Sequence, residues 1–420
     1  MAATACGDDA PPPPGTDSGR ADTSVADAAM DAPPADATAD APPVDAPSVD
    51  AGSGCIAEQF ELSTDSLGRT RPIAIAPDGD GFVVVWSEWD DGEQLRIAHV
   101  PTTGSPGEPV LLGTEGAPGA NDRTPELASG MLTFTSDLTT LAVPEVMAQP
   151  LDAAFAPVGA AVRVTNDDLA QRAHAIVATG AGFLLLYAET GATETRVLAQ
   201  QLQTTGALEG APQVIGTTTD SIDRLSAAPL GPDVGVTWVD QRRDGGDVWV
   251  RHLAATGAPL GDAIMVSTEG NASGGVRMAS DEIAGVVVFD VMVGGLRPEI
   301  RSRLLNLDAT PLTFEQIVSF APAQGTGASL AAFAGGFAST YHSTEDRETT
   351  ARVSFIHGST GVVDSTVVLG ATGSTHGRTA AAVASDGTLL VAWSDVRDGE
   401  GTKIMLSRLV CPDAWLRCSR

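Results

Sequence analysis

Short apolar runs that end in an aromatic residue recur along the chain at a nearly constant distance. Examples are FVVVW (82–86), FLLLY (183–187), VGVTW (234–238) and GVVVF (285–289). The closing aromatics, which we call the anchors, are Trp86, Phe134, Tyr187, Trp238, Phe289, Tyr341 and Trp393. Successive anchors lie 48, 53, 51, 51, 52 and 52 residues apart. Repeats of about 50 residues predict a propeller or a solenoid.

Every repeat has the same order of strands and turns. A strand such as PIAIA (72–76) and a glycine-rich turn precede the apolar run, and two strands such as LRIAHV (95–100) and PVLLG (109–113) follow it. Most apolar runs do not alternate with polar residues, so both faces of these strands must be covered. Four strands per repeat, without a helical period, are typical of the blades of a β-propeller.

The two ends of the repeat region favour a closed ring over an open solenoid. The last repeat stops after its third strand, KIMLSRLVC (403–411), whereas FELSTDS (60–66) precedes the first repeat and matches the fourth-strand sequence IMVSTEG (264–270). We therefore expect the N-terminal strand to complete the last blade, which removes both open sheet edges. The sequence predicts an all-β fold, a seven-bladed β-propeller of four-stranded blades over residues 55–420.

The same alignment brings two cysteines together. Cys55 takes the place of Pro259, and Cys411 the place of Thr256, at the two ends of the turn TGAP in the fourth repeat. Their Cα atoms should then be less than about 7 Å apart, close enough for a disulfide. A Cys55–Cys411 bond would close the ring covalently and is typical of an oxidising, extracytoplasmic compartment. Cys418 is left over, either free or in competition for one of these two.

An acidic residue follows several anchors at a distance of two, and an Asp-Gly pair comes soon after it. The clearest copies are VVWSEWDDG (84–92), VTWVDQRRDGG (236–246) and VAWSDVRDG (391–399). Asp-Gly supplies the positive φ angles of a tight hairpin. The acid can accept hydrogen bonds from N–H groups of the same turn. A structural role therefore explains the repetition. The turns of successive blades also meet around one rim. An acidic ring that binds Ca²⁺ or a cationic group would consist of Glu88, Glu189, Asp240 and Asp395; no other cofactor is expected.

The first 54 residues differ from the rest in composition. Residues 1–54 consist mostly of Ala, Asp and Pro and lack the apolar side chains that offset the entropy of ordering, so they are predicted to be a disordered, extended tether. Ten Asp and one Arg give the tether a charge of −9; the whole chain carries −30, and subtracting −9 leaves −21 for the remainder. This excess of acid argues against nucleic acid as a partner, because phosphate binding needs clustered Lys and Arg.

Patterns typical of catalysis are poor in this sequence. H-E-x-x-H, G-x-S-x-G and G-x-x-x-x-G-K-S/T do not occur. The repeats invite comparison with sialidases, but SDGTLLVAW (385–393) does not match the spacing of their S-x-D-x-G-x-T-W box. Both tyrosines, Tyr187 and Tyr341, are anchors, whereas the sialidase mechanism needs a tyrosine nucleophile. An enzyme that acts on a polysaccharide is therefore the least favoured function.

Two further features resemble a known group of proteins. MAATAC (1–6) resembles the cleavage and lipidation site of a bacterial lipoprotein, with Cys6 as the acylated residue. Residues 56–412, with their recurring VVVW-S-E/D and R-D-G phrases, resemble secreted bacterial β-propeller lipoproteins of the kind common in myxobacteria. The resemblance implies a protein at the cell surface or outer membrane that contacts the membrane only through a lipid anchor. It implies no particular activity.

These features together favour a binding function. We expect a monomeric module that is tethered to the cell surface and presents one face of the propeller to a protein or polysaccharide ligand. The alternatives are a structural component of envelope assembly and, less favoured, the polysaccharide-acting enzyme.

Overall fold

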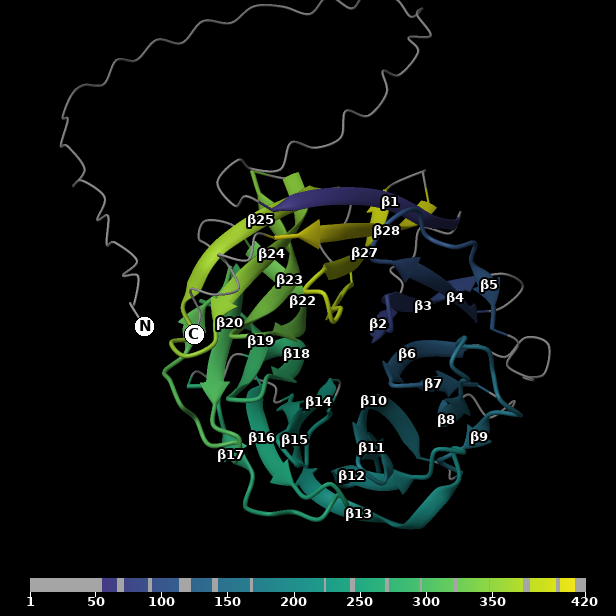
Figure 1. Ribbon diagram of the computed structural model, residues 1–420. Helices are drawn as coiled ribbons and strands as arrows, with labels where there is room; N and C mark the ends of the chain where they lie inside the picture. Colours follow the sequence, from purple (N-terminus) through teal and green to yellow (C-terminus); the bar gives the residue numbers. More distant parts are fainter. Residues whose placement is uncertain are drawn as a thin grey trace, which may run out of the picture. The chain divides into compact units, whose positions relative to one another are not determined.

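The structure, a computed structural model, describes residues 55–65, 72–89, 93–112, 122–137, 143–166, 169–222, 224–241, 246–268, 272–294, 297–319, 324–346, 348–372, 378–397 and 401–411 (Figure 1). Strands and turns make up these ranges, and no helix occurs in them. They therefore contain no helix that could cross a membrane. The predicted tether and Cys6 lie outside the described residues, as does Cys418.

The strands form seven four-stranded antiparallel sheets, the blades of a propeller, as the sequence predicted. The first strand of each blade lies nearest the axis, where it contacts the first strands of both neighbouring blades (Figure 1). The strands are, in blade 1, β2 (Ile73–Asp78), β3 (Gly81–Trp89), β4 (Glu93–Pro101) and β5 (Val110–Leu111); in blade 2, β6 (Asp122–Ala128), β7 (Met131–Ser136), β8 (Glu145–Pro150) and β9 (Val162–Arg163); in blade 3, β10 (Ala170–Thr179), β11 (Gly182–Thr190), β12 (Thr195–Leu202) and β13 (Leu208–Thr218); in blade 4, β14 (Leu225–Leu230), β15 (Asp233–Asp240), β16 (Asp247–Leu253) and β17 (Ile264–Met265); in blade 5, β18 (Ala272–Ser280), β19 (Gly285–Val293), β20 (Arg297–Leu305) and β21 (Gln316–Ile317); in blade 6, β22 (Gln324–Phe333), β23 (Gly336–Glu345), β24 (Glu348–His357) and β25 (Val363–Thr372); and in blade 7, β26 (Thr379–Val383), β27 (Leu389–Arg397), β28 (Gly401–Val410) and β1 (Ile56–Asp65).

The N-terminal strand completes the last blade, as predicted. β1 runs antiparallel to β28, from the pair Ile56–Val410 to the pair Asp65–Thr402. The buried guanidinium of Arg408 in β28 joins three segments at this point. It pairs with Glu58 of β1 and donates to the backbone oxygens of Pro101 and Gly104 in blade 1, at 2.7 and 2.8 Å. A hydrogen-bonded ladder and a buried cation therefore connect the two ends of the chain to the first blade.

A disulfide closes the ring covalently, also as predicted. Cys55 and Cys411 are bonded, with their Cα atoms 4.1 Å apart and a separation of 356 positions in the sequence. Cys55 is buried against the interface of blades 6 and 7. The bond takes the place of the hairpin turn that joins the third and fourth strands in the other blades.

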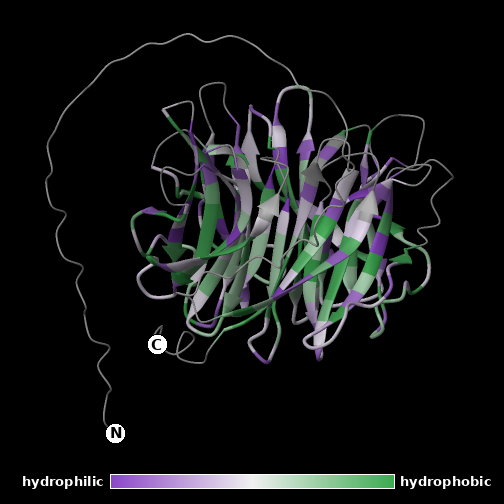
Figure 2. Cartoon of the chain, turned by 90° about the horizontal axis from the view of Figure 1, so that it is seen from above, coloured by the Kyte–Doolittle hydropathy of each residue, from purple (hydrophilic) through white to green (hydrophobic). Residues whose placement is uncertain are grey.

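The hydrophobic core consists of seven clusters, each between two neighbouring blades. All seven anchors are buried, and each belongs to the cluster that its blade shares with the preceding blade. Trp238 shows how closely they fit: a Cβ on Gly216, in the outer strand of blade 3, would lie 3.0 Å from the indole ring. In side view the hydrophobic residues follow the strands between the two faces (Figure 2). The apolar runs are thus covered on both sides, as their pattern required.

Loss of the Cys55–Cys411 bond should destabilise the propeller without changing its fold. We expect the Cys55→Ser/Cys411→Ser variant to lose about 2–5 kcal/mol of unfolding free energy, because the bond restricts a very long loop of the unfolded chain. Urea denaturation with and without reductant measures this loss. The reductant should reproduce it in the wild type and have no further effect on the double variant. Equal stability of the two proteins under oxidising conditions would contradict the role assigned to the bond.

Candidate functional site: an arginine cluster on the propeller axis

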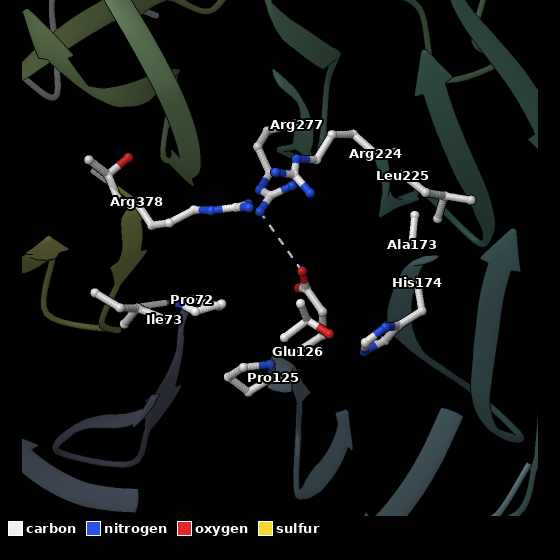
Figure 3. Close-up of a pocket in the computed structure, with 12 residues that line it drawn as sticks. Pro72, Ile73, Pro125, Glu126, Ala173, His174, Arg224, Leu225, Arg277 and Arg378 are labelled. Atoms are coloured by element: carbon white, nitrogen blue, oxygen red, sulfur yellow. Dashed lines mark ion pairs between the residues drawn. The ribbon is translucent and has the colours of Figure 1, made fainter. Parts of the chain in front are cut away.

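The innermost strands all begin on the same face of the propeller, where their first residues surround the axis. Arg224 directly precedes β14, Arg378 directly precedes β26, and Arg277 lies within β18. These residues, with Glu126 of β6 and His174 of β10, line a cavity of about 40 Å³ (Figure 3). We call this cavity the arginine mouth and the side on which it lies the arginine face.

The three guanidinium groups converge although their charges repel. Arg224, Arg277 and Arg378 come from blades 4, 5 and 7, and their ends meet above the carboxyl group of Glu126 (Figure 3). Nη2 of Arg277 lies 3.9 Å from Oε1 of Glu126. Burial, together with the charges of Arg224 and Arg277, lowers the pKa of Arg378 to about 9, although Glu126 and Asp290 oppose this shift. Burial is the largest cause of this shift, and the two neighbouring arginine charges act in the same direction.

Two carboxyl groups accompany the arginines, and burial raises the pKa of both. The pKa of Glu126 is raised by burial against the opposing charges of the three arginines. The pKa of Asp290, in β19, is raised to about 6 by burial, against the N–H group of Gly327 and the charges of Arg224 and Arg277. Each carboxyl group is thus held in a place where its charged form is unfavourable.

Asp290 has little room and few hydrogen bonds. The residue is 8% exposed. Its Oδ2 accepts the N–H of Gly327 at 3.2 Å, the N–H of Ala328 also stabilises the carboxylate, and its Oδ1 is buried without a partner among the described residues. A Cβ on Gly275 would lie 2.4 Å from Oδ2, so glycine at that position makes room for the carboxyl group. A buried oxygen without a partner is costly, and an acid whose pKa is perturbed by burial is a candidate for a functional site.

His174 does not add positive charge to the mouth at neutral pH. Burial lowers its pKa to about 4, against a hydrogen bond to the backbone of Thr133, and the charge of Arg277 lowers it further. The unfolded chain takes up a proton here near pH 6.5 and the folded chain only near 4. This residue therefore makes the fold less stable as the pH falls through that range.

The arrangement suits a small anion. Guanidinium groups bind carboxylates through paired, charge-assisted hydrogen bonds. The volume of about 40 Å³ corresponds to a few water molecules, so the cavity admits a group of the size of a carboxylate and excludes a sugar ring. A larger ligand would place only its anionic group in the mouth.

A recurring arginine in the sequence points to these three residues. Six of the seven repeats carry an arginine 11 to 15 residues before the anchor: Arg71, Arg123, Arg172, Arg224, Arg277 and Arg378. Arg71 and the side chain of Arg172 lie outside the described part of the chain. Arg123 pairs with Glu93 and Asp137, at 2.7 and 3.2 Å. The other three form the mouth.

The four acids proposed from the sequence lie toward the same face, at the ends of second strands rather than at the axis. Glu88 pairs with Arg96 at 2.5 Å, and Glu189 pairs with Arg196. Asp240 accepts a hydrogen bond from Thr218 at 2.9 Å, and Asp395 is buried opposite Lys403. These partners come from the same blade or the one before it. The Asp-Gly turns at 91–92, 244–245 and 398–399 lie outside the described residues.

A metal centre is not evident in this part of the chain. No group of three or more His, Cys, Asp or Glu side chains arranged to hold a metal ion occurs within the described ranges. Calcium binding by the four acids stays a prediction, and the structure adds no geometry in its favour.

Comparison with known proteins places the chain by its fold alone. No family model matches the sequence, and no curated protein matches it. A protein of unknown function from Dyadobacter fermentans is similar in structure, with a TM-score of 0.51 and 12% identity over 86% of this chain and 100% of that one. Penicillium chrysogenum α-L-arabinanase gives 0.49 and 11%, over 84% and 97%. Trypanosoma rangeli sialidase gives 0.48 and 8%, over 86% of this chain and 60% of the sialidase. The chain is a seven-bladed β-propeller, and its mouth has to be interpreted from its own residues.

Replacing Asp290 by asparagine should stabilise the protein at neutral pH. The carboxyl group titrates near pH 6 in the folded chain and near 3.8 in the unfolded chain, so its ionised form destabilises the fold above pH 6. We expect Asp290→Asn to gain roughly 1–3 kcal/mol at pH 8, a gain that shrinks as the pH falls through 6 toward 4. Urea denaturation across this range measures it, with the exposed Glu282→Gln as the matched control. A variant less stable than wild type at pH 8 would contradict the burial argument.

Proposed function

We propose that the protein is a binding module of the cell exterior that holds the anionic group of its ligand in the arginine mouth. The observation that carries this proposal is the convergence of Arg224, Arg277 and Arg378 from three blades on one small axial cavity. Like charges at such short range destabilise the fold unless an anion completes the site. A bound carboxylate would accept hydrogen bonds from guanidinium groups whose positions the rigid ring already determines, so little entropy is lost on binding.

The sequence predicts a protein or polysaccharide ligand, and the excess of acid in the chain favours cations, basic proteins or neutral sugars. The arginine mouth adds a local preference for an anionic group to that expectation. An acidic polysaccharide and a protein with exposed carboxylates both offer an anionic group narrow enough for the mouth. The Cys55–Cys411 disulfide is typical of an extracytoplasmic compartment. Acylation of Cys6 would hold the module at the cell surface on its acidic tether, with the propeller free to reach its ligand. Neither the disulfide nor the acylation of Cys6 distinguishes between these two classes of ligand.

Substitution of Arg378 should remove anion binding and stabilise the empty protein. Acetate and methanesulfonate should raise the melting temperature of the wild type, because they bind only the folded state. Arg378→Gln should melt at a higher temperature than wild type without anion, since a repelled, partly buried charge is gone, and should lose at least about tenfold in anion affinity. Thermal denaturation against anion concentration measures both effects. The exposed Arg297→Gln serves as control and should respond like wild type; equal anion responses in the two variants would contradict the assignment.

Anion binding should strengthen as the pH falls. Asp290, with a pKa of about 6, competes with the ligand for Arg224, Arg277 and Arg378 when it is ionised, and loses this charge on acidification. We expect the affinity for methanesulfonate, which stays ionised, to rise by about tenfold between pH 8 and 5. Isothermal titration measures this. Asp290→Asn should remove the part of the pH dependence that comes from Asp290, whereas Glu126, whose pKa is also raised by burial, keeps its own part. An affinity that falls on acidification would argue against the site.

A further inference from the structure

A separate pocket lies away from the axis, between the outer parts of blades 3 and 4. It has a volume of about 740 Å³, which is typical of a site for a small molecule. Blade 3 lines it with residues 216–220, at the end of β13 and directly after it, and blade 4 lines it with residues that include Asp240, Trp249, Arg251 and Ala263. We call it the side pocket. It shares none of its described lining residues with the arginine mouth.

Trp249 departs from the pattern of the repeats. It lies in β16, directly opposite the anchor Trp238. The residue opposite the anchor in the other six blades is an arginine, a methionine or a leucine, namely Arg96, Met147, Leu198, Arg301, Arg352 and Met405. A residue that departs from a pattern set by packing is a candidate for a functional role.

The part of the Trp249 side chain that reaches the side pocket is carbon. Trp249 is half-buried against the core cluster of blades 3 and 4 and lines the pocket. Its Nε1, which is the one polar atom of an indole side chain, is buried. A ligand in the pocket therefore contacts an apolar aromatic surface, and such a surface packs well against C–H groups.

The equivalent position between blades 4 and 5 is occupied by an ion pair. There Arg301 lies opposite the anchor of its blade, and Glu315 has the position that Ala263 has in blade 4. Nη1 of Arg301 lies 3.0 Å from Oε2 of Glu315, and Glu315 also accepts the N–H of Thr268 from blade 4. Trp249 and the small Ala263 form no such pair, and the side pocket lies next to them.

Polar groups that are held in place surround the indole. The hydroxyl of Thr218 donates to Oδ1 of Asp240 at 2.9 Å and accepts the N–H of Asp220 at 3.1 Å, so it connects the two blades. Asp220 and Asp240 line the pocket with carboxylate oxygens, and the flanking Thr217 and Thr219 are exposed. Carboxylates only accept hydrogen bonds, so the pocket suits a ligand that carries several hydroxyl donors.

The charges in the side pocket favour a neutral ligand. The guanidinium group of Arg251 lines the pocket and donates to the backbone oxygens of Ile215 in blade 3 and Gly261 in blade 4. A cationic ligand would be repelled by this fixed charge, and an anionic ligand would be repelled by Asp220 and Asp240. A ligand without charge meets neither repulsion.

We infer that the side pocket binds a neutral saccharide. A sugar ring combines an apolar C–H face with hydroxyl groups around its edge, which are the two chemistries that the pocket offers. The C–H face lies against the indole of Trp249, and hydroxyl groups donate to Asp220 and Asp240. The side pocket is separate from the arginine mouth, so this inference goes beyond the proposed function and does not rest on it.

Calorimetric titration of the full chain with neutral oligosaccharides tests the inference. The panel consists of cellotetraose, laminaritetraose, xylotetraose, mannotetraose and chitotetraose, and acetyl-lysine amide is the cationic probe. We expect saturable binding of at least one saccharide, and acetyl-lysine amide should bind at least about tenfold more weakly than that saccharide. Arg378→Gln, which alters the arginine mouth, should bind the saccharide as tightly as wild type.

Two substitutions assign the binding to the side pocket. Trp249→Leu should weaken the saccharide by at least about tenfold, because the contact with the indole is lost. The fold should tolerate this change, since Leu198 has the same position in blade 3. Asp220→Asn should weaken the saccharide by about tenfold, because a charged acceptor becomes neutral, and it decides the result if Trp249→Leu does not fold. Trp89→Leu, which removes an exposed tryptophan of blade 1, is the matched control and should behave like wild type.

The outcomes separate this inference from the proposed function. If no saccharide of the panel binds, the inference is wrong, whatever the arginine mouth does with anions. It is also wrong if a saccharide binds wild type, Trp249→Leu and Asp220→Asn equally, or if acetyl-lysine amide binds more tightly than every saccharide. If Arg378→Gln abolishes saccharide binding, the ligand lies in the arginine mouth and the side pocket is not its site.

Discussion

Closure of the ring is the constraint on which the rest of the structure depends. The two ends of the chain meet in blade 7, through the ladder between β1 and β28, the Cys55–Cys411 bond and the buried contacts of Arg408 with blade 1. Each innermost strand contacts the one before it and the one after it around the whole ring. The arginine mouth draws residues from several blades, so it exists only while the ring is closed. An opening at blade 7 would move Arg378 away from Arg224 and Arg277.

The packing between blades offsets an unfavourable arrangement at the axis. Each of the seven interfaces buries an anchor, and a buried aromatic side chain contributes about 1.5–3 kcal/mol through the hydrophobic effect. That stability holds three arginines together and keeps Asp290 in a buried place that raises its pKa to about 6. It also keeps Arg378 where burial and the charges of Arg224 and Arg277 lower its pKa to about 9. Residues kept at a cost to stability are often the functional ones. Arg224, Arg277 and Arg378 line the axial cavity, and this supports the binding role that we propose.

The fold could be predicted from the sequence because its determinants are local and repeated. The regular spacing of anchors such as Trp86 and Trp393 gave the number of blades, and the missing fourth strand gave the closure and the disulfide. The site was harder to predict, because it depends on which repeats contribute arginines to the axial cavity. Arg224 and Arg378 look like ordinary polar residues before a strand, and only the ring brings them together. The acids Glu88 and Glu189 drew attention by repetition, yet they pair with arginines of their own blades.

Asp290 shows what a finer comparison of the repeats could have found. It directly follows the anchor Phe289, where the other repeats have Ser87, Thr135, Ala188, Val239, His342 and Ser394. The other six repeats have a neutral residue or a histidine at this position, so an aspartate departs from the structural pattern. Such departures mark functional residues. Its meaning still required the fold, because Gly275 and Gly327, which accommodate it, come from other strands.

Anomalous diffraction from crystals soaked in bromide tests the central claim, that the arginine mouth is an anion site, most directly. The account predicts a strong bromide peak on the propeller axis, in contact with the guanidinium groups of Arg224, Arg277 and Arg378, and its loss in Arg378→Gln crystals. An empty mouth in crystals that bind bromide at exposed arginines such as Arg297 would contradict it.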